Sequence, residues 1–195
     1  AKYLGDDYFQ ENYTTAKFTV KKKTSPIVAS SMDITVGKDE IITVTLPKDA
    51  TGRVVVNVNG EEYYGEVVNG RAKIRVPELA SGRYRATVTY EGDSKYLPSK
   101  STVTSFKVDK VTSPISTPIE VIQEGQNGVV RVNLPDDATG TVIVTIDGKK
   151  YTLKLVNGKA ELVIPGLRIG DHKITVFYSG DAKYAANSTI SQIIV

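Results

Sequence analysis

Residue types on which common catalytic and metal sites depend are scarce in this 195-residue sequence. It has no cysteine and a single histidine, His172. The absence of cysteine excludes disulfides and thiolate-bound metals, but it leaves an extracellular location open. One histidine cannot supply a site that needs several nitrogen or sulfur ligands. The sequence therefore predicts neither a metal nor another cofactor.

Long apolar runs and blocks of like charge are also missing. No segment approaches the length of a membrane-spanning helix, and no signal peptide is present. The chain begins in the middle of a repeated pattern, so we interpret it as a fragment of a larger protein, in which case missing targeting signals carry no information. The net charge of +3 is spread along the chain, which argues against a nucleic-acid partner. The run Lys21-Lys22-Lys23 is interpreted as a solvated connector.

What the sequence does contain is a repeat with an offset of 88 residues. The pattern Tyr-x-Gly-Asp-x-Lys-Tyr occurs at 90–96 and again at 178–184, and from Lys22 onward the two copies align without a gap. A degenerate copy, Tyr3-Leu4-Gly5-Asp6-Asp7-Tyr8, opens the chain with one residue missing from the turn. A unit of 88 residues is long enough to form a hydrophobic core of its own. We therefore predict the terminal hairpin of a preceding repeat at 1–20, a first complete domain at 21–108 and a second at 109–195.

Apolar and polar residues alternate within each repeat, as they do in strands with one buried face. The pattern predicts seven strands, which recur 88 residues later, near 27–34, 40–46, 53–59, 61–67, 71–76, 82–90 and 101–108. Short strands without a helical period indicate an all-β fold of two Greek-key sandwiches. Type I′ hairpin turns, which need positive φ at both central residues, fit Asn59-Gly60, Asp147-Gly148, Asn69-Gly70 and Asn157-Gly158. The fourth strand, with a tight turn on either side, could pair with the third, with the fifth, or with one after the other.

Four segments of the second copy carry a resemblance to a known family: Ala138-Thr139-Gly140-Thr141-Val142, Val156-Asn157-Gly158-Lys159-Ala160, Gly170-Asp171-His172-Lys173-Ile174-Thr175 and Tyr178-Ser179-Gly180-Asp181-Ala182-Lys183-Tyr184. They resemble the bacterial Ig-like repeat family, which is also abundant in adhesin-like surface proteins of methanogenic archaea. The resemblance covers 21–195 twice over. It implies tandem Ig-like sandwiches from cell-surface stalks and adhesins, without a shared catalytic site.

The connector between the repeats lacks glycine and contains a proline and β-branched residues, so we expect an elongated, semi-rigid pair of domains. Residues 1–20 pose a different problem, because an isolated hairpin is marginally stable in water. Ala16, Phe18 and Val20 match inward positions of the last strand of the first repeat. We predict that the open strand edge of 1–20 pairs with the first domain or with a neighbouring molecule. The chain is otherwise expected to be a monomer.

The Gly-Asp turn is the strongest candidate for chemistry. Asp93 and Asp181 are hard oxygen ligands of the kind that calcium prefers, but each turn offers one carboxylate, with Glu91 at best nearby, against about six to eight oxygens around calcium. We favour a structural role, in which the aspartate caps its own turn and the tyrosines of the motif pack across the end of the sandwich. His172 aligns with Tyr84 and is interpreted as a packing residue, not as part of a Ser/His/Asp triad.

The sequence also bears on two covalent modifications. Surface Ig-like domains can carry a Lys–Asn isopeptide cross-link, but Ser99 replaces Asn187 in the first repeat and no core-facing acid is evident beside Lys110 and Asn187. We predict no cross-link. Sequons at Asn12 and Asn187 permit N-glycosylation without predicting it, because about one or two such triplets arise by chance in this composition.

An exposed apolar patch is predicted on the second repeat. The third and sixth strands are neighbours in the three-stranded sheet of such sandwiches, which places Ile143 opposite Phe177 on the outward side, with Ile193 of the last strand close by. Clusters of exposed apolar residues mark contact sites. Strands also carry β-branched and aromatic residues on both faces without any such role, and we favour that interpretation. Ile143, Phe177 and Ile193 remain a candidate contact patch.

These observations predict a non-enzymatic, extracellular module of the cell surface. It would be a stalk or adhesion segment of a large adhesin-like protein that presents a binding region away from the cell envelope. The alternative is a module that binds a carbohydrate or protein ligand through loops or through the outer sheet face of one repeat. Its partners would be neighbouring repeats of the same chain and a host-cell, microbial or glycan surface. The lack of a convergent acid, base and nucleophile set argues against an enzyme.

Overall fold

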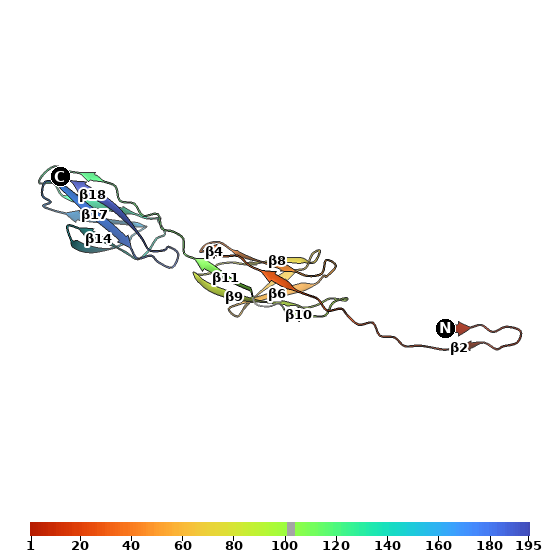
Figure 1. Cartoon of the computed structure of the whole chain (residues 1–195). Helices are drawn as coiled ribbons and strands as arrows, with labels where there is room; N and C mark the ends of the chain where they lie inside the picture. Colours follow the sequence, from red (N-terminus) through yellow and green to blue (C-terminus); the bar gives the residue numbers. More distant parts are fainter. Residues whose placement is uncertain (101–103) are drawn as a thin grey trace.

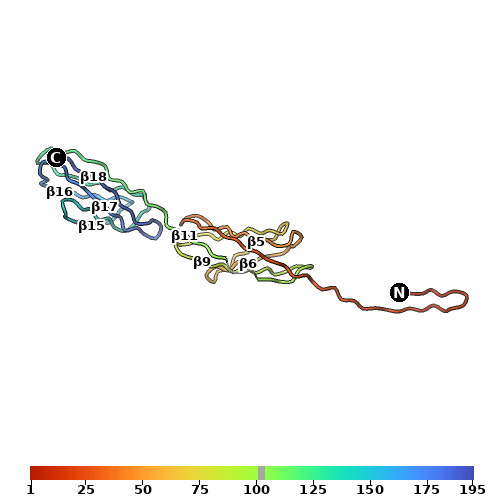
Figure 2. The backbone as a smooth tube through the Cα atoms, in the orientation of Figure 1, coloured from red at the N-terminus to blue at the C-terminus, as the bar shows by residue number. Residues whose placement is uncertain are grey.

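The structure, a computed structural model, describes residues 1–100 and 104–195, and all regular elements in these ranges are β-strands. An N-terminal hairpin and two β-sandwiches follow one another along an extended line (Figures 1 and 2). Each sandwich encloses its own cluster of buried apolar side chains. The predicted all-β class of tandem, elongated Ig-like sandwiches is confirmed. No helix in the described ranges is long and apolar enough to cross a membrane.

The first sandwich packs a smaller sheet against a larger one. The smaller sheet has the order β3-β5-β8 and the larger sheet has the order β4-β11-β9-β6-β7, with β10 also paired to β9. The bounds are β3 Val28–Ser30, β4 Ile34–Thr35, β5 Glu40–Thr45, β6 Arg53–Val58, β7 Glu61–Glu66, β8 Arg71–Val76, β9 Gly82–Tyr90, β10 Ser99–Lys100 and β11 Thr104–Asp109. The last predicted strand, 101–108, thus falls partly outside the described residues.

The second sandwich repeats this plan. Its larger sheet has the order β12-β18-β17-β14-β15, and its smaller sheet pairs β13 with β16 and is extended by a bridge between Ser116 and Asn133. The bounds are β12 Glu120–Val121, β13 Gly128–Asn133, β14 Thr141–Ile146, β15 Lys149–Lys154, β16 Lys159–Ile164, β17 Asp171–Tyr178 and β18 Asn187–Ile194.

The first predicted strand, 27–34, is divided between the two sheets. Its β3 half pairs antiparallel with β5, whereas its β4 half pairs parallel with β11. The crossing is held by side chains, because Asp33 Oδ1 accepts a 2.7 Å hydrogen bond from Lys107 N and Ser31 Oγ lies 2.7 Å from Thr104 Oγ1. Through this parallel pair, the first and the last strand of the repeat lie side by side in one sheet.

The fourth strand, left open by the sequence, belongs to the larger sheet. β7 pairs with β6 along its whole length, and β15 pairs with β14 in the same way. Toward the fifth strand, the described residues form one isolated bridge in each repeat, between Val68 and Arg71 in the first and between Val156 and Lys159 in the second. The third and sixth strands are neighbours as predicted, but their sheet is larger than the predicted three strands: it has six strands in the first repeat, counting β10, and five in the second. The fourth strand and half of the first join it in both repeats.

Hairpin turns behave as their sequences predict. The central residues of all four Asn-Gly or Asp-Gly turns have positive φ, from 48° at Asp147 to 93° at Gly60. Alternation then sends every second side chain inward, so that Val54, Val56 and Val58 of β6 are buried, as are Val142, Val144 and Ile146 of β14.

The N-terminal hairpin forms a two-stranded sheet of its own, from β1 (Lys2–Tyr3) and β2 (Asn12–Tyr13). Among the residues that the structure describes, its strands pair with each other and not with the first domain, so that part of the prediction is wrong for the single chain. Pairing with a neighbouring molecule stays a prediction.

The turn of this hairpin also corrects the sequence alignment. Asp6 Oδ1 accepts hydrogen bonds from Tyr8 N at 2.9 Å and Phe9 N at 2.8 Å. Asp93 makes the corresponding bonds with Lys95 and Tyr96. Phe9, and not Tyr8, therefore occupies the last position of the motif, and no residue is missing from the turn.

Candidate functional site

The Gly-Asp turn lies at the end of each sandwich where the connector enters. β9 ends at Tyr90, and Asp93 Oδ1 then accepts hydrogen bonds from Lys95 N at 2.8 Å and Tyr96 N at 2.7 Å. The second repeat has the same two distances around Asp181. Gly92 has φ 84°, and a Cβ on it would lie 2.9 Å from Tyr96 O, so only glycine fits. The aspartate caps its own turn, as predicted.

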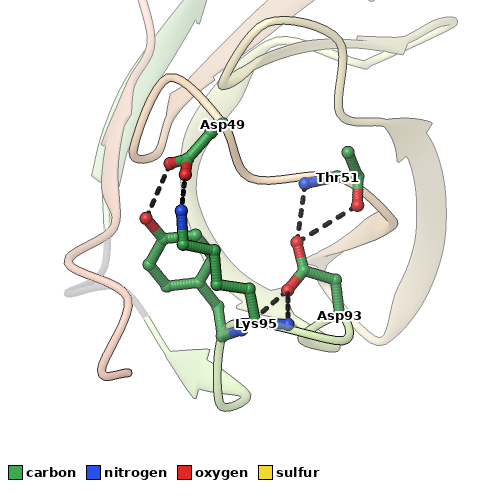
Figure 3. A network of polar contacts seen from close by, with 5 residues as sticks. Asp49, Thr51, Asp93 and Lys95 are labelled. Atoms are coloured by element: carbon green, nitrogen blue, oxygen red, sulfur yellow. Dashed lines mark hydrogen bonds and ion pairs between the residues drawn. The ribbon is translucent and has the colours of Figure 1, made fainter. Parts of the chain in front are cut away.

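The other carboxylate oxygen ties this turn to the loop that crosses between the two sheets. Asp93 Oδ2 accepts from Thr51 N at 2.8 Å and from Thr51 Oγ1 at 3.1 Å, and Figure 3 shows both bonds. Buried Tyr90 donates its hydroxyl to Thr51 O at 2.7 Å. Asp181, Thr139 and Tyr178 form the equivalent set in the second repeat, at 2.9, 3.1 and 2.9 Å.

A second aspartate completes the network from the same loop. Asp49 pairs with Lys95, as Figure 3 shows. It also accepts a 2.7 Å hydrogen bond from the Tyr96 hydroxyl. In the second repeat Lys183 Nζ lies 2.5 Å from Asp137 Oδ2, and the Tyr184 hydroxyl donates to Asp137 at 2.8 Å. Each lysine also lies over the ring of its neighbouring tyrosine.

This network keeps its carboxylates ionised. The backbone N–H of Thr51, opposed by burial and helped by the N–H groups of the turn, holds the pKa of Asp93 well below its usual range. Burial opposes the ionisation of Asp181, but the N–H groups of Tyr184, Thr139 and Lys183 outweigh it and hold the pKa of Asp181 low as well. Lys95 and the Tyr96 hydroxyl lower the pKa of Asp49 to about 2.

The buried tyrosines are shifted in the opposite direction. Burial, followed by the nearby charge of Asp93, raises the pKa of Tyr90 to about 12. Burial likewise raises the pKa of Tyr178 above its usual range. None of these groups exchanges a proton near neutral pH, so the network suits a structural role and not acid–base catalysis.

A calcium ion would have to displace donors of the chain itself. Both oxygens of Asp93 accept N–H or O–H groups, and Glu91 pairs with Arg53 through two bonds of 2.9 and 3.0 Å. Within the described residues there is no group of three or more histidine, cysteine, aspartate and glutamate side chains placed to hold a metal.

The connector of each repeat binds beside its Gly-Asp turn. Lys23 pairs in parallel with Tyr96, with Lys23 N donating to Lys95 O and Leu97 N donating to Lys23 O, both at 2.8 Å. Buried Ser25 donates to Leu97 O at 2.8 Å. The turn motif therefore anchors the segment that enters the domain as well as closing the last hairpin.

The second repeat anchors its connector in the same way. Val111 N donates to Lys183 O and Ala185 N donates to Val111 O, both at 2.8 Å. Ser113, which is fully buried, donates to Ala185 O at 2.9 Å. Asn187 adds a bond from its side-chain nitrogen to Ser113 O at 2.7 Å.

The sequence did not assign the anchoring residues to a common site. Asp49 and Thr51 recur 88 residues later as Asp137 and Thr139. Their recurrence in both copies was the available signal, but their partners lie about 40 residues away in the chain and only the fold brings them together.

The predicted patch on the second repeat is only partly assembled. Ile143 of β14 lies opposite Phe177 of β17, on the outward face, and Phe177 is 44% exposed. Ile193 does not belong there: it lies opposite His172 and is fully buried in the core. Ile190 of β18, which is 65% exposed, lies on the outer face instead, diagonal to Phe177.

The error at Ile193 comes from one extra residue in the first repeat. Asn187 is opposite Tyr178, as Ser99 is opposite Tyr90, but Ile193 takes the inward place of Phe106, 87 and not 88 residues away. A gapless alignment cannot register this difference. From that residue onward, the gapless alignment assigns inward positions of the last strand to the outward face and outward positions to the inward face.

His172 occupies the place of Tyr84, as the alignment predicts. Tyr84 donates its hydroxyl to Ala80 O at 2.9 Å, and His172 Nε2 lies 2.8 Å from Arg168 O at the matching position. His172 Nδ1 lies 2.6 Å from Asp147. The carbonyl of Arg168, opposed by burial and helped by Asp147, raises the pKa of His172. The imidazole is thus a hydrogen-bonded packing group at the far end of the domain.

Lys110 and Asn187 have separate partners. Lys110 Nζ donates to Asp181 O, whereas the Asn187 side chain donates to Ser113 O. The geometry thus gives the two side chains different anchoring roles at the connector.

Two sandwiches of this topology, built from one internal repeat and joined by an anchored connector, define a tandem Ig-like structural protein. The sequence profile of the bacterial Ig-like domain (group 3) family matches residues 27–109 and 115–195, so the chain belongs to that family. A search of curated proteins gives no match.

Solved structures add likenesses of low identity. One is the titin domains Z1Z2 in complex with telethonin, with 13% identity and a TM-score of 0.49, over 90% of this chain and 98% of that chain. Another is the fibronectin(III)-like modules of Clostridium thermocellum CbhA, with 19% identity and a TM-score of 0.35, over 88% of this chain and 94% of that chain.

Proposed function

We propose that the chain is a stalk and adhesion segment of a large, extracellular, adhesin-like protein of the cell surface. In this role it presents a binding region away from the cell envelope, and it performs no catalysis. Membership of a bacterial Ig-like family supports a structural module. The observation that carries the proposal further is the way in which one repeat is joined to the next.

Only one residue separates the two repeats at their junction. Asp109 is the last residue of β11, and its carbonyl accepts a 2.9 Å hydrogen bond from Val36 N of the first repeat. Val111 already makes two backbone bonds with the second repeat. Lys110, between them, donates from its side chain to Asp181 O. A connector held at adjacent residues by two domains leaves little room for a hinge.

The entry to the first repeat uses the same bonds. Lys22 Nζ lies 2.5 Å from Asp93 O, and Lys23 pairs with Lys95 and Leu97 as Val111 pairs with Lys183 and Ala185. Anchoring is therefore built into the repeat and would recur in every copy of a longer array. Such an array would be a stiff spacer, in which each added repeat extends the reach by one domain.

Inserting flexible residues at the junction tests this proposal. Three residues, Gly-Ser-Gly, placed after Lys110 should let the two domains tumble separately, whereas the unmodified chain should show one shared orientation in NMR residual dipolar couplings. The same insertion after Gly148, whose hairpin turn has open space around it, is the control and should leave the orientation fixed. Independent alignment of the two domains in the unmodified chain would contradict the proposal.

A second candidate function rests on the outer face of the second repeat. Ile143, Phe177 and Ile190 lie on adjacent strands there. The exposed side chains of Phe177 and Ile190 could contact a glycan or a protein. Binding on a glycan or protein array that is lost in the double variant Ile143→Asp, Phe177→Ser, with unchanged thermal stability, would support this role. Equal binding by the variant would rule out this face.

A further inference from the structure

The N-terminal segment, residues 1–20, exposes a set of apolar side chains with no core of its own. Phe18 is 88% exposed, Val20 84% and Phe9 69%. Exposed apolar side chains that lie together mark a surface that a partner covers. The two complete repeats of the same chain show which partner this would be, because they contain the same segment in its buried state.

The hairpin of 1–13 has the geometry of the last hairpin in a complete repeat. Tyr3 lies opposite Asn12, as Tyr90 lies opposite Ser99 and Tyr178 opposite Asn187. The turn glycine also matches, since Gly5, Gly92 and Gly180 have φ values of 82°, 84° and 79°. A Cβ on each of them would meet the carbonyl oxygen of the residue that ends the motif, at 2.8 or 2.9 Å.

The exposed side chains of this segment correspond to core residues of the complete repeats. Tyr3 corresponds to Tyr90 and Tyr178, which are both fully buried, and Phe9 corresponds to Tyr96 and Tyr184, which are each 6% exposed. Farther along, Phe18 stands where Phe106 and Ile193 are buried, and Val20 stands where Val108 is buried. The alternation of Phe18 and Val20 with Lys17 and Thr19 gives one apolar face and one polar face.

The loop that receives this hairpin in a complete repeat has no counterpart within 1–20. In the first repeat, Thr51 and Asp49 of that loop bond to Tyr90, Asp93 and Tyr96. No Asp-Ala-Thr-Gly segment occurs within 1–20. The hairpin thus carries one half of a set of contacts that recurs in both complete repeats.

We infer that residues 1–20 are an interaction surface for one kind of partner: the remainder of an Ig-like sandwich of this same repeat type, which lacks its last strand. The partner would supply an open edge on its sixth strand, a parallel half-strand for Val20 to join, and the aspartate and threonine of the receiving loop. Residues 1–20 then close that sandwich, and Lys22 and Lys23 anchor it to the repeat that follows.

Fusion proteins test this inference with the chain's own repeats as the partner. Residues 109–176 placed directly before Lys2 of the chain should form a hybrid sandwich closed by 2–20, and residues 22–88 placed there should do the same. Amide hydrogen exchange of 2–20 should slow by on the order of 100-fold or more in a hybrid relative to the unfused chain, because amides in a cooperative core exchange only after unfolding.

Paired variants of the hybrid separate a specific fit from simple lengthening. Phe18→Ser with Val20→Ser should abolish the slow exchange, whereas the outward pair Lys17→Ser with Thr19→Ser should preserve it. Fast exchange of 2–20 in both fusions, or failure of both to fold while the two original repeats stay folded, would overturn the inference. A dimer of the unfused chain that protects 1–20 would overturn it too, because the partner would then be a second copy.

Discussion

Asp181 is only partly buried, yet replacing it should strongly destabilise the second repeat. Its carboxylate accepts four hydrogen bonds, from Thr139 N, Thr139 Oγ1, Lys183 N and Tyr184 N. Each such bond in a partly exposed site contributes about 1 kcal/mol net. Asp181→Ala should therefore lower the free energy of unfolding by about 3–4 kcal/mol. For a domain of this size that corresponds to a fall in melting temperature of about 12 °C or more.

Asp181→Asn provides a graded comparison. The amide oxygen can still accept from Lys183 and Tyr184, but the amide nitrogen then faces the donors of Thr139. We expect about half the loss of the alanine variant. The contribution of the carboxylate should also disappear in acid: its lowered pKa stabilises the fold above the unfolded value of about 3.9, and this stabilisation is lost as the pH falls through the folded pKa.

Thermal unfolding followed by NMR or by hydrogen exchange resolves the two repeats, and the first repeat, with Asp93 intact, serves as the reference in the same sample. A loss below about 1 kcal/mol for Asp181→Ala, or equal losses for alanine and asparagine, would refute the reasoning. The first result would mean that water replaces the bonds at little cost, and the second that the two oxygens do not act separately.

Two further predictions concern the second repeat. The raised pKa of His172 means that its charged form stabilises the fold below about pH 6.5, and this stabilisation should be lost as the pH rises through the folded pKa. Calorimetry between about pH 5.5 and 9 should show this loss. The variant His172→Tyr, which has the residue of the first repeat, should no longer show the pH dependence. Gly180→Ala should lower the free energy of unfolding by more than about 2 kcal/mol, since the new Cβ would lie 2.8 Å from Tyr184 O. Gly148→Ala, at a residue with positive φ but nothing within 4 Å, should lower it by about 1 kcal/mol. Equal losses in urea unfolding would contradict this account.

The sequence predicts the long strands well because alternation is a local property. β5, β6, β8 and β9 lie within about a residue of their predicted bounds, and both kinds of hairpin turn have the expected φ values. The division of the first strand between two sheets was not predicted. It depends on Asp33 and Ser31 meeting the last strand more than 70 residues away, and no local pattern reports such a contact.

The candidate site shows the same limit. The Asx cap of the Gly-Asp turn could be predicted, since Asp93 bonds to residues two and three positions later. The parallel bridge between Lys23 and Tyr96 could not be predicted, because Lys23 belongs to a lysine run that is typical of a solvated connector. Ile193 was placed on the wrong face because one additional residue in the other copy changes the alternation of a strand by half a period.

The docking of the connector also has a consequence for biosynthesis. Val111 and Ser113 leave the ribosome early, whereas their partners Lys183 and Ala185 follow about 72 residues later. The first segment of each repeat therefore has no partner until almost all of that repeat has been synthesised. In a chain of two such repeats, this order delays the completion of each domain until its own final hairpin has been synthesised.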